Sequence, residues 1–375
     1  MTSSITPAER ALDAALMRRC CELALQAAGH TAPNPLVGSL ITQPSQDPTT
    51  SLEDTIVGEG FHPKAGEPHA EIFALRAAGD RAAGGTLYVN LEPCNHTGRT
   101  PPCSEAVIAA GIRRVVIGMR DPNPKASGGI ETLKAAGIEI SVGIEEALCR
   151  QVNEAFLHRV QYRQPFGILK YAMTLDGKIA TTTGHSAWVS GPQSRQWVHR
   201  LRSRCDAVII GGNTVRKDNP NLTSHGQGDR NPLRVVMSRQ LEVPTTANLW
   251  QTDIAPTLVI TQTSAEVSTV KALTQQGVEV VQLGELTPQA AMETLYQRGC
   301  MSVLWECGGT LAAEAIAANA IQKVCAFIAP KLIGGKSAPT PIGELGLEKM
   351  TDAQVLSNLS VESIGDDILL QGYLG

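Results

Sequence analysis

A histidine, a glutamate and two cysteines in the first third of the sequence have the types and the spacing of a zinc site. His69-Ala70-Glu71 begins a helical pattern, Cys94 follows a strand-like run, and Cys103 comes after eight intervening residues. One imidazole and two thiolates can hold Zn²⁺ while leaving its fourth position to water. Helix N-termini stabilise thiolates, and Cys103 lies at the start of a second helical pattern. We therefore expect His69, Cys94 and Cys103 to bind one zinc ion.

Glu71 is the expected acid–base group of this site. It lies two residues from His69, where its carboxylate can exchange protons with water without binding the metal. Zinc lowers the pKa of a bound water to roughly 7, so the set is suited to hydrolysis at neutral pH. The order H-x-E followed by P-C is that of zinc-dependent nucleobase deaminases, although there the second cysteine follows after two residues. The alternative interpretation is a core histidine with two buried thiols.

The composition argues against several classes of protein. The 375 residues include 32 basic and 36 acidic side chains, a formal charge of −4, and 4% aromatic residues, whereas a general nucleic-acid binder needs a basic surface and stacking platforms. Nine cysteines, an odd number in a long chain, suit a reducing compartment. We see no apolar signal segment and no run of the ~18 apolar residues that a membrane span requires. These features predict a cytoplasmic enzyme for a small molecule, without nucleic-acid or membrane partners.

The elements that must position the zinc site alternate along the first 150 residues. Strand-like runs occupy 36–42, 56–61, 86–93, 113–119 and 138–143, and helical patterns occupy 11–28, 69–79, 101–111 and 129–137. Such alternation predicts an α/β sandwich around one sheet. The polar stretch 43–54 has no periodicity, and we expect a surface loop there.

A second α/β domain is expected in the rest of the chain. Residues 145–164 form a polar helical stretch that ends in Gln-Pro, typical of a connector. Beyond it, strand-like runs lie at 167–173, 206–212, 233–238, 257–261, 278–283 and 302–307, with helical patterns at 193–204 and 310–320. We see no repeat between the two halves. The expected organisation is therefore one domain over 1–150, a connector over 151–165 and a second domain over 166–375.

Three segments of the first half together resemble the deaminase domain of bifunctional riboflavin-biosynthesis deaminase/reductases. They read TAPNPLVG, FHPKAGEPHAE and LEPCNHTGRTPPC, and the resemblance covers most of residues 10–145. It implies a cytidine-deaminase-like three-layer domain that acts on 2,5-diamino-6-hydroxy-4-(5-phosphoribosylamino)pyrimidine. It also implies that Asn34 contacts the pyrimidine and that the loop after Cys94 closes over the base.

Glycine pairs are the clearest chemical signal of the second half. Gly211-Gly212 and Gly308-Gly309 each end a strand-like run, and the second pair leads directly into a helical pattern. Glycines at such a turn let a phosphate approach a helix N-terminus. Tight turns without a ligand explain these residues equally well, and no G-x-G-x-x-G segment indicates a dinucleotide site of the Rossmann type.

Several segments of the second half resemble the reductase domain of the same family, in the same order. They include LKYAMTLDGKIAT, HSAWVSG, GGNTVRKDNPNLT, WECGGTLAAEAI and APKLIGG. The resemblance implies a dihydrofolate-reductase-like α/β domain that uses NADPH to reduce the ribosyl carbon. The residues that match cofactor positions are Ala172, Trp188, Thr214, Asp218, Ser238, Gly308, Gly309 and Thr310. Those that match substrate positions are Lys170, Ser186, Arg202, Leu222 and Glu306.

One departure from the family concerns the substrate phosphate. After NPNLT the family usually carries an arginine, whereas this chain has Ser224-His225. We expect His225 to take that place, or Arg230 to fold back to it. Arg202 is expected to grip the phosphate through two hydrogen bonds, and Lys170 to pair with a buried Glu306, which needs a partner.

The sequence therefore predicts a bifunctional enzyme of riboflavin biosynthesis. Zinc-dependent deamination in the first domain is followed by NADPH-dependent reduction of the ribosyl group, giving 5-amino-6-(5-phosphoribitylamino)uracil. The family is usually oligomeric through its reductase domain, so the resemblance implies a homodimer or homotetramer. One alternative keeps the deaminase and makes the second domain non-catalytic. Another is a nucleic-acid-editing deaminase, against which the charge and the scarcity of aromatic residues argue.

Overall fold

The computed structural model describes residues 6–44, 53–97 and 101–375. The chain divides into two compact units, residues 1–162 and 163–375, and each is described here by itself. The residues 45–52 of the expected surface loop lie outside the described part of the chain. Among the described residues, no helix combines the length and the apolar character needed to cross a bilayer.

A mixed sheet forms the centre of the first unit. Within the described residues it has five strands in the order β2-β1-β3-β4-β5. Strand β1 runs antiparallel to β2 and β3, while β3, β4 and β5 are parallel. The strands are β1 (Gly38–Thr42), β2 (Ile56–Phe61), β3 (Thr86–Leu91), β4 (Arg114–Met119) and β5 (Glu139–Val142).

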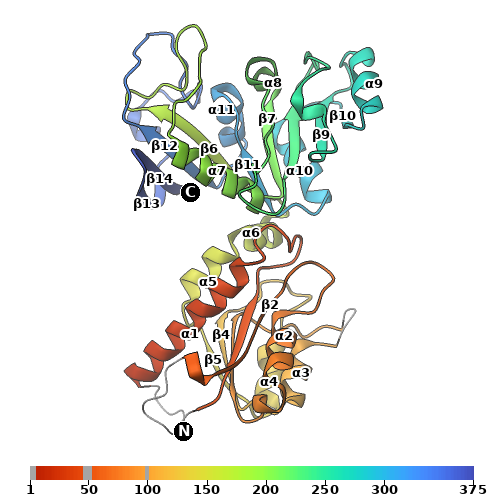
Figure 1. The fold of residues 1–375 in the computed structure, drawn as a ribbon, viewed down its shortest axis with the longest axis vertical. Helices are drawn as coiled ribbons and strands as arrows, with labels where there is room; N and C mark the ends of the chain where they lie inside the picture. Colours follow the sequence, from red (N-terminus) through yellow and green to blue (C-terminus); the bar gives the residue numbers. More distant parts are fainter. Residues whose placement is uncertain (1–5, 45–52, 98–100) are drawn as a thin grey trace. The chain divides into compact units, whose positions relative to one another are not determined.

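Helices cover both faces of this sheet and complete three layers. Helices α1 and α5 contact one face, and α2, α3 and α4 gather on the other, as Figure 1 shows. They are α1 (Pro7–Leu25), α2 (Ala70–Ala78), α3 (Cys103–Ala109), α4 (Gly129–Ala135), α5 (Glu146–Val152) and α6 (Glu154–Tyr162). The alternation expected from the sequence is confirmed, and the expected boundary at residue 150 falls inside α5.

Helix α1 begins and ends earlier than its apolar pattern predicts. Thr6 caps it, because its hydroxyl accepts from Glu9 N at 3.2 Å and Glu9 Oε2 accepts from Thr6 N at 2.8 Å. Pro7 then supplies a first helical residue that needs no N–H partner. After Leu25 the chain continues in tight turns up to Gly29, which has a positive φ of 91°.

Two glycines of β2 bring the helix of the zinc motif close to the sheet. A Cβ on Gly58 would lie 2.3 Å from Ala74 O, and one on Gly60 would lie 2.4 Å from Phe73 Cβ. Any side chain at either position would push α2 outwards. These glycines therefore fix the distance of α2, and of His69 at its N-terminal cap, from the strands.

The second unit is built on a larger sheet with one antiparallel end. Within the described residues it has nine strands in the order β10-β9-β8-β7-β11-β6-β12-β14-β13. The pairs from β10 to β12 are parallel, and β14 pairs antiparallel with β12 and β13. The strands are β6 (Phe166–Thr174), β7 (Ala207–Gly211), β8 (Leu233–Met237), β9 (Thr257–Gln262), β10 (Glu279–Leu283), β11 (Ser302–Trp305), β12 (Lys323–Ala329), β13 (Leu356–Ile364) and β14 (Asp367–Leu374).

Helices pack on both faces of this second sheet. Ala326 of β12 belongs to a buried cluster with residues of α10 and α11, whereas the next residue, Phe327, contacts Trp197 of α7. Since adjacent residues of a strand point to opposite faces, α7 covers the face opposite to α10 and α11. The helices are α7 (Pro192–Arg204), α8 (Gly212–Asp218), α9 (Val267–Gln275), α10 (Pro288–Gln297) and α11 (Gly309–Ala317). Short 3₁₀ turns lie at Glu53–Thr55, Gly79–Ala82, Asn248–Trp250 and Met350–Asp352.

Candidate active sites

The histidine and the two cysteines of the zinc motif meet at the N-terminal ends of α2 and α3. Their potential ligand atoms all lie within 4.8 Å of one another. His69 Nδ1 is 3.4 Å from Cys94 Sγ and 3.2 Å from Cys103 Sγ. The start of α2, the residues after β3 and the start of α3 thus bring one nitrogen and two sulfurs to one point. This donor set fits a zinc ion with an open fourth position.

The N-terminus of α3 stabilises the thiolate form of Cys94. The backbone N–H of Cys103, the first residue of α3, donates to Cys94 Sγ at 3.4 Å. The pKa of Cys94 is lowered to about 4, chiefly by hydrogen bonding from Cys103 and, against the opposing effect of burial, by His69. The thiolate is the form that binds zinc.

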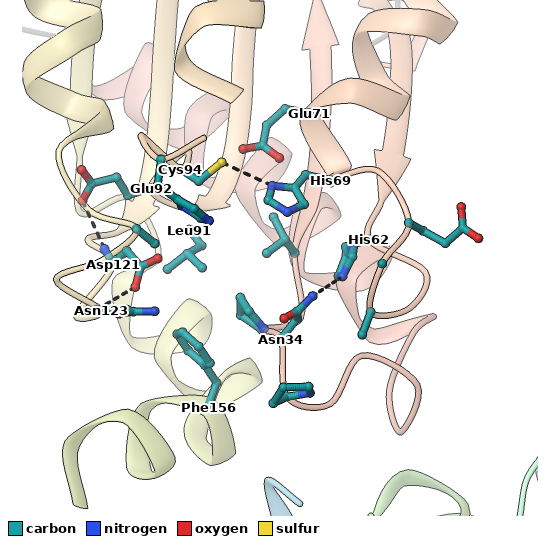
Figure 2. A pocket seen from close by; sticks show the side chains of 18 of the residues that line it. Asn34, His62, His69, Glu71, Leu91, Glu92, Cys94, Asp121, Asn123 and Phe156 are labelled. Atoms are coloured by element: carbon teal, nitrogen blue, oxygen red, sulfur yellow. Dashed lines mark hydrogen bonds between the residues drawn. The ribbon is translucent and has the colours of Figure 1, made fainter. Parts of the chain in front are cut away.

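Glu71 lies beside this cluster and is almost fully buried, at 3% exposure. Burial raises the pKa of its carboxyl to about 7, and the neighbouring His69 counteracts part of this rise. A carboxyl with such a pKa can both accept and release a proton near neutral pH. Figure 2 shows Glu71 beside His69 and Cys94 at one end of a cavity.

The cavity above the cluster has a volume of about 500 Å³. Asn34, which is expected to contact the pyrimidine, lines it, and its side-chain Nδ2 lies 3.1 Å from His62 Nε2. His62 Nδ1 is held in turn by Pro68 O at 3.0 Å. His62 Nδ1 therefore donates to this carbonyl, which leaves Nε2 as an acceptor for the Asn34 amide.

Several residues of the cavity wall carried no signal in the sequence analysis. Asp121 and Asn123 follow β4, and Phe156 comes from α6 (Figure 2). Asp121 accepts from Asn123 N at 2.8 Å, and burial is the main cause that raises the pKa of Asp121 to about 6. Polar residues directly after a parallel strand were the one available indication, since such strand ends commonly form sites.

Asparagine side chains hold the loop that carries Asn34. Leu36 N donates to Asn153 Oδ1 at 2.9 Å, and Leu36 O accepts from Asn90 Nδ2 at 3.0 Å and Asn153 Nδ2 at 2.9 Å. Leu36 therefore makes side-chain bonds in place of strand pairing. This explains why β1 begins at Gly38 and not at residue 36, where the pattern places its start.

A cavity of about 290 Å³ in the second unit collects many of the residues expected to bind substrate and cofactor. Ala172, Trp188, Ser186, Lys170 and Arg202 all line it. Ser186 Oγ also donates to Asp218 Oδ1 at 3.5 Å, so Asp218 lies beside a residue of the cavity lining.

Glu306 has a different hydrogen-bond partner from the one expected. Arg202 Nε and Nη2 donate to the two carboxylate oxygens of Glu306 at 2.6 and 3.0 Å. Lys170 is half-buried on the neighbouring strand, where desolvation lowers the pKa of its ammonium group and the charge of Glu306 opposes that effect. Lys170 is thus near Glu306 electrostatically, but the direct partner is Arg202.

His225 and Arg230, the two residues expected as alternatives to bind the substrate phosphate, have different surroundings in the structure. Arg230 lies 3.7 Å from Asp206 Oδ1 and does not line the 290 Å³ cavity. His225 stacks on His199, with ring centroids 4.2 Å apart and an angle of 26° between the planes. His199 lines the cavity.

A further cavity of the second unit, of about 230 Å³, lies at the N-termini of α8 and α11. Ser238, Arg239 and Thr310 line it, and Arg239 Nη2 is 3.4 Å from Glu314 Oε1. Gly308 caps α11, and nothing lies within 4 Å of the place where a Cβ on Gly308 would be. This open turn at a helix N-terminus fits the pyrophosphate of a dinucleotide.

Seven expected residues lie outside the linings of these two cavities: Thr214, Asp218, Leu222, His225, Glu306, Gly308 and Gly309. Thr214 is half-buried in α8. Leu222 is 3% exposed and has a positive φ of 53°. Gly309 packs closely against the loop 340–343, with 2.7 Å between the position of its missing Cβ and Thr340 O.

Comparisons with known proteins match each of the two units to a known protein family. Residues 10–119 match the cytidine and deoxycytidylate deaminase zinc-binding region, and residues 165–370 match the RibD C-terminal domain. Riboflavin biosynthesis protein RibD of Synechocystis sp. is 61% identical over 96% of this chain and 95% of its own length.

Solved structures extend this similarity to the fold. A diaminohydroxyphosphoribosylaminopyrimidine deaminase/5-amino-6-(5-phosphoribosylamino)uracil reductase from Thermotoga maritima has a TM-score of 0.85 and 32% identity, covering 98% of this chain and 99% of its own. RibD of Acinetobacter baumannii has a TM-score of 0.84 and 35% identity, covering 98% of this chain and 100% of its own. These matches confirm the fold class expected for both units.

Proposed function

This chain belongs to the family of bifunctional riboflavin-biosynthesis deaminase/reductases, and from that premise we propose how its own residues divide the two activities. The first unit deaminates 2,5-diamino-6-hydroxy-4-(5-phosphoribosylamino)pyrimidine. The second unit reduces the ribosyl side chain of the product with NADPH, giving 5-amino-6-(5-phosphoribitylamino)uracil. The observation that carries the proposal is the convergence of one nitrogen and two sulfurs within 4.8 Å beside the buried Glu71.

His69, Cys94 and Cys103 hold the zinc ion in this proposal. When bound, zinc supplies a Lewis acid that makes water acidic enough to attack a ring carbon at neutral pH. The chain contributes the dry surroundings, because Cys103 and Glu71 are buried at 2% and 3% exposure. It also fixes the orientation of Cys94 through the N–H of Cys103.

Glu71 moves the protons. Its carboxylate takes a proton from the attacking water, passes it to the ring nitrogen, and later helps to protonate the departing ammonia. Asn34, held by His62 at 3.1 Å, faces the same cavity and binds the pyrimidine edge. Asp121 and Asn123 supply further polar groups to the opposite wall, where the rest of the substrate lies.

The second unit binds NADPH, which supplies a hydride when bound. We assign its binding to two sets of residues, Ala172, Trp188, Thr214 and Asp218 in one and Ser238, Gly308, Gly309 and Thr310 in the other. Ser238 and Arg239 line the 230 Å³ cavity and are suited to the adenosine 2′-phosphate.

Substrate binding in the second unit falls to Lys170, Ser186, Arg202, Leu222, His225 and Glu306. Since both oxygens of Glu306 accept from Arg202, we assign Arg202 a part in orienting Glu306 as well as in binding the substrate. Lys170, close to both, keeps the reacting end of the cavity positively charged.

We further propose a cytoplasmic homo-oligomer, a dimer or tetramer. The nine cysteines of the chain are all free thiols, which supports a reducing compartment. Strand β13 lies at one edge of the large sheet, and its Leu359 and Val361 are 59% and 67% exposed. Such an apolar edge supports pairing with a second copy of the chain.

One assay tests both activities. The purified protein receives the diaminopyrimidine substrate with and without NADPH, and ammonia release and NADPH absorbance are followed together. We expect ammonia in both reactions and NADPH consumption only after deamination. Ammonia release without NADPH consumption would leave the second unit non-catalytic, and the absence of both would refute the proposal.

A further inference from the structure

The 290 Å³ cavity of the second unit is lined by basic side chains from one strand and one helix. Lys170 comes from β6, and Arg195, His199 and Arg202 come from α7. Two of these groups are already engaged. Arg202 is paired with Glu306 at 2.6 Å, and Lys170, which is half-buried, interacts with the charges of that pair without a hydrogen bond.

Arg195 is engaged as well. Its guanidinium lies 4.3 Å from the centroid of the Trp188 ring, and its Nη1 donates to Ser190 O at 2.6 Å. Among the described residues that line this cavity, the basic groups without a hydrogen-bond partner are therefore Lys170 and His199, and His225 is stacked on His199 outside the lining.

The structure holds the two imidazoles together through several anchors. Arg202 Nη1 donates to Thr223 O at 3.1 Å, two residues before His225. Ser224 N and Oγ both donate to Asn231 Oδ1, at 2.8 and 3.0 Å. Gln196 of α7 donates to Gln227 at 2.9 Å. The loop is thus fastened to α7 on both sides of the stack.

The surroundings of the pair oppose its protonation. Burial lowers the pKa of His199 to about 4, with further lowering by His225, Arg202 and Arg195 and an opposing effect of Glu306. Burial and Arg202 likewise lower the pKa of His225. Two stacked rings cannot both carry charge at 4.2 Å without repulsion. An anion bound in the cavity favours protonation of the pair, because its negative charge compensates the positive charge of the imidazolium.

We propose that His199 and His225 act as one titratable recognition element for the phosphate group of the reductase substrate, and that the pair takes up a proton when the phosphate binds. This inference rests on the proposed reductase function of the second unit. It assigns a role to His199, and it makes substrate affinity weaken as the pH rises. A guanidinium at position 225 would bind without this pH dependence, because arginine stays charged.

Histidine NMR tests the charge of the pair directly. Inorganic sulfate is the probe, because its charge is constant between pH 5.5 and 8.5, whereas a phosphate monoester titrates near pH ~6. In full-length protein with ¹³C-labelled histidine, H199Q and H225Q identify the two resonances. We expect saturating sulfate to raise the apparent pKa of at least one of them by about one unit or more, into the range between pH 6 and pH 8, and to leave His185, an exposed histidine outside the cavity lining, unchanged.

Kinetics of NADPH consumption test the consequence. From pH 6 to pH 8, we expect the KM of the deaminated substrate for wild-type enzyme to rise relative to that for H225R by about tenfold, the factor that one pKa unit represents. H225Q should show a high KM at both pH values, and H185Q should follow the wild type. The kcat values should change little.

The outcomes separate the two proposals. Identical pH dependence of KM in the wild type, H225R and H225Q, or a sulfate response absent from both His199 and His225, overturns the inference. Absence of NADPH consumption in every protein refutes the reductase function, and the sulfate titration then still decides whether the histidine pair binds an anion.

Discussion

Arg202 and Glu306 meet through two hydrogen bonds, one to each carboxylate oxygen, although they are 104 positions apart in the sequence. Both side chains are largely buried, at 12% and 11% exposure. A buried pair of this kind satisfies each partner's charge, and removing one partner leaves the other without compensation. The pair therefore combines a place in the reductase cavity with a structural role in the second unit.

The first prediction concerns this pair. Arg202→Ala should lower the free energy of unfolding of the second unit by about 3–5 kcal/mol, because Glu306 remains buried and charged. It should also lower the reductase kcat/KM by roughly 10- to 150-fold, for the loss of one charge-assisted contact. The double variant R202M/E306Q should regain much of the stability but not the activity. Denaturant titration and steady-state kinetics measure the two effects, and a fully stable R202A would contradict the structural role.

The second prediction is a pH dependence of stability. Burial by itself would raise the pKa of Glu306, but the charge and hydrogen bonds of Arg202 lower it from 4.5 to about 2. A carboxylate with a lowered pKa contributes stability above its unfolded value, and this contribution disappears as the pH falls from about 4.5 to about 2. The stability gap between wild type and E306Q should therefore shrink by about 3 kcal/mol over that range.

A matched control accompanies the acid titration. Glu279 pairs with Arg298 at the surface, with 54% of the glutamate side chain exposed. Because exposed pairs contribute little, E279Q should show a gap that changes by less than about 1 kcal/mol. If E306Q and E279Q respond alike to acid, Glu306 is not the group that titrates.

The third prediction concerns the metal. Cys103→Ser should lose most of its zinc and all deamination, because only the histidine and one thiolate remain as strong ligands. Cys205→Ala, a change at a buried cysteine of the second unit, should keep one zinc per chain. Metal analysis of the purified proteins measures both. Full zinc occupancy in C103S would place the third ligand elsewhere.

The fourth prediction separates proton transfer from metal binding. Glu71→Gln keeps the size of the side chain but removes the proton carrier, so zinc content should stay normal while deamination falls by about 10²- to 10⁴-fold. Reduction of substrate that is already deaminated should continue at the wild-type rate. Ammonia release at a near-normal rate would make the carboxylate structural.

The fifth prediction uses the difference between two adjacent glycines. A side chain on Gly309 would meet Thr340 O at 2.7 Å and disturb the loop, whereas one on Gly308 meets nothing within 4 Å. Gly308→Val should therefore leave the fold intact and weaken NADPH binding by at least about tenfold. Gly284→Val, another position with open space, should bind NADPH normally in a fluorescence titration. Unchanged NADPH affinity in G308V would remove this turn from the cofactor site.

The zinc cluster was predictable from the sequence because its residue types and their short spacing are typical of a zinc site. His69 and Glu71 share one helix start, and Cys94 and Cys103 flank one loop. The alternation of strands and helices was predictable for the same reason, since it depends on local apolar periodicity. The last three strands were not singled out. Strand β13 is exposed over most of its length, so it carries no buried face to detect.

Long-range partners could not be predicted. The sequence analysis paired Glu306 with Lys170, and that pairing was wrong, because the packing of α7 on the sheet brings Arg202 to Glu306. The positions of Asp121 and Phe156 in the deaminase cavity likewise depend on how a strand end and a helix of the same unit meet. Such contacts are set by tertiary packing, which local propensity does not encode.

The side chain of Asn153 holds the backbone of Leu36 through two hydrogen bonds. This contact restricts where the chain can be divided when either enzyme is fused to a different partner. A crossover at residue 150 would separate the loop that carries Asn34 from Asn153, one of the two asparagines that hold it. It would also remove Phe156 from the cavity wall. A crossover after Tyr162 keeps both, since the first compact unit extends to that residue. The segment that must be transferred as a whole is therefore longer than the zinc-binding region of the deaminase. We expect chimaeric proteins to be functional only when the fusion point lies beyond α6.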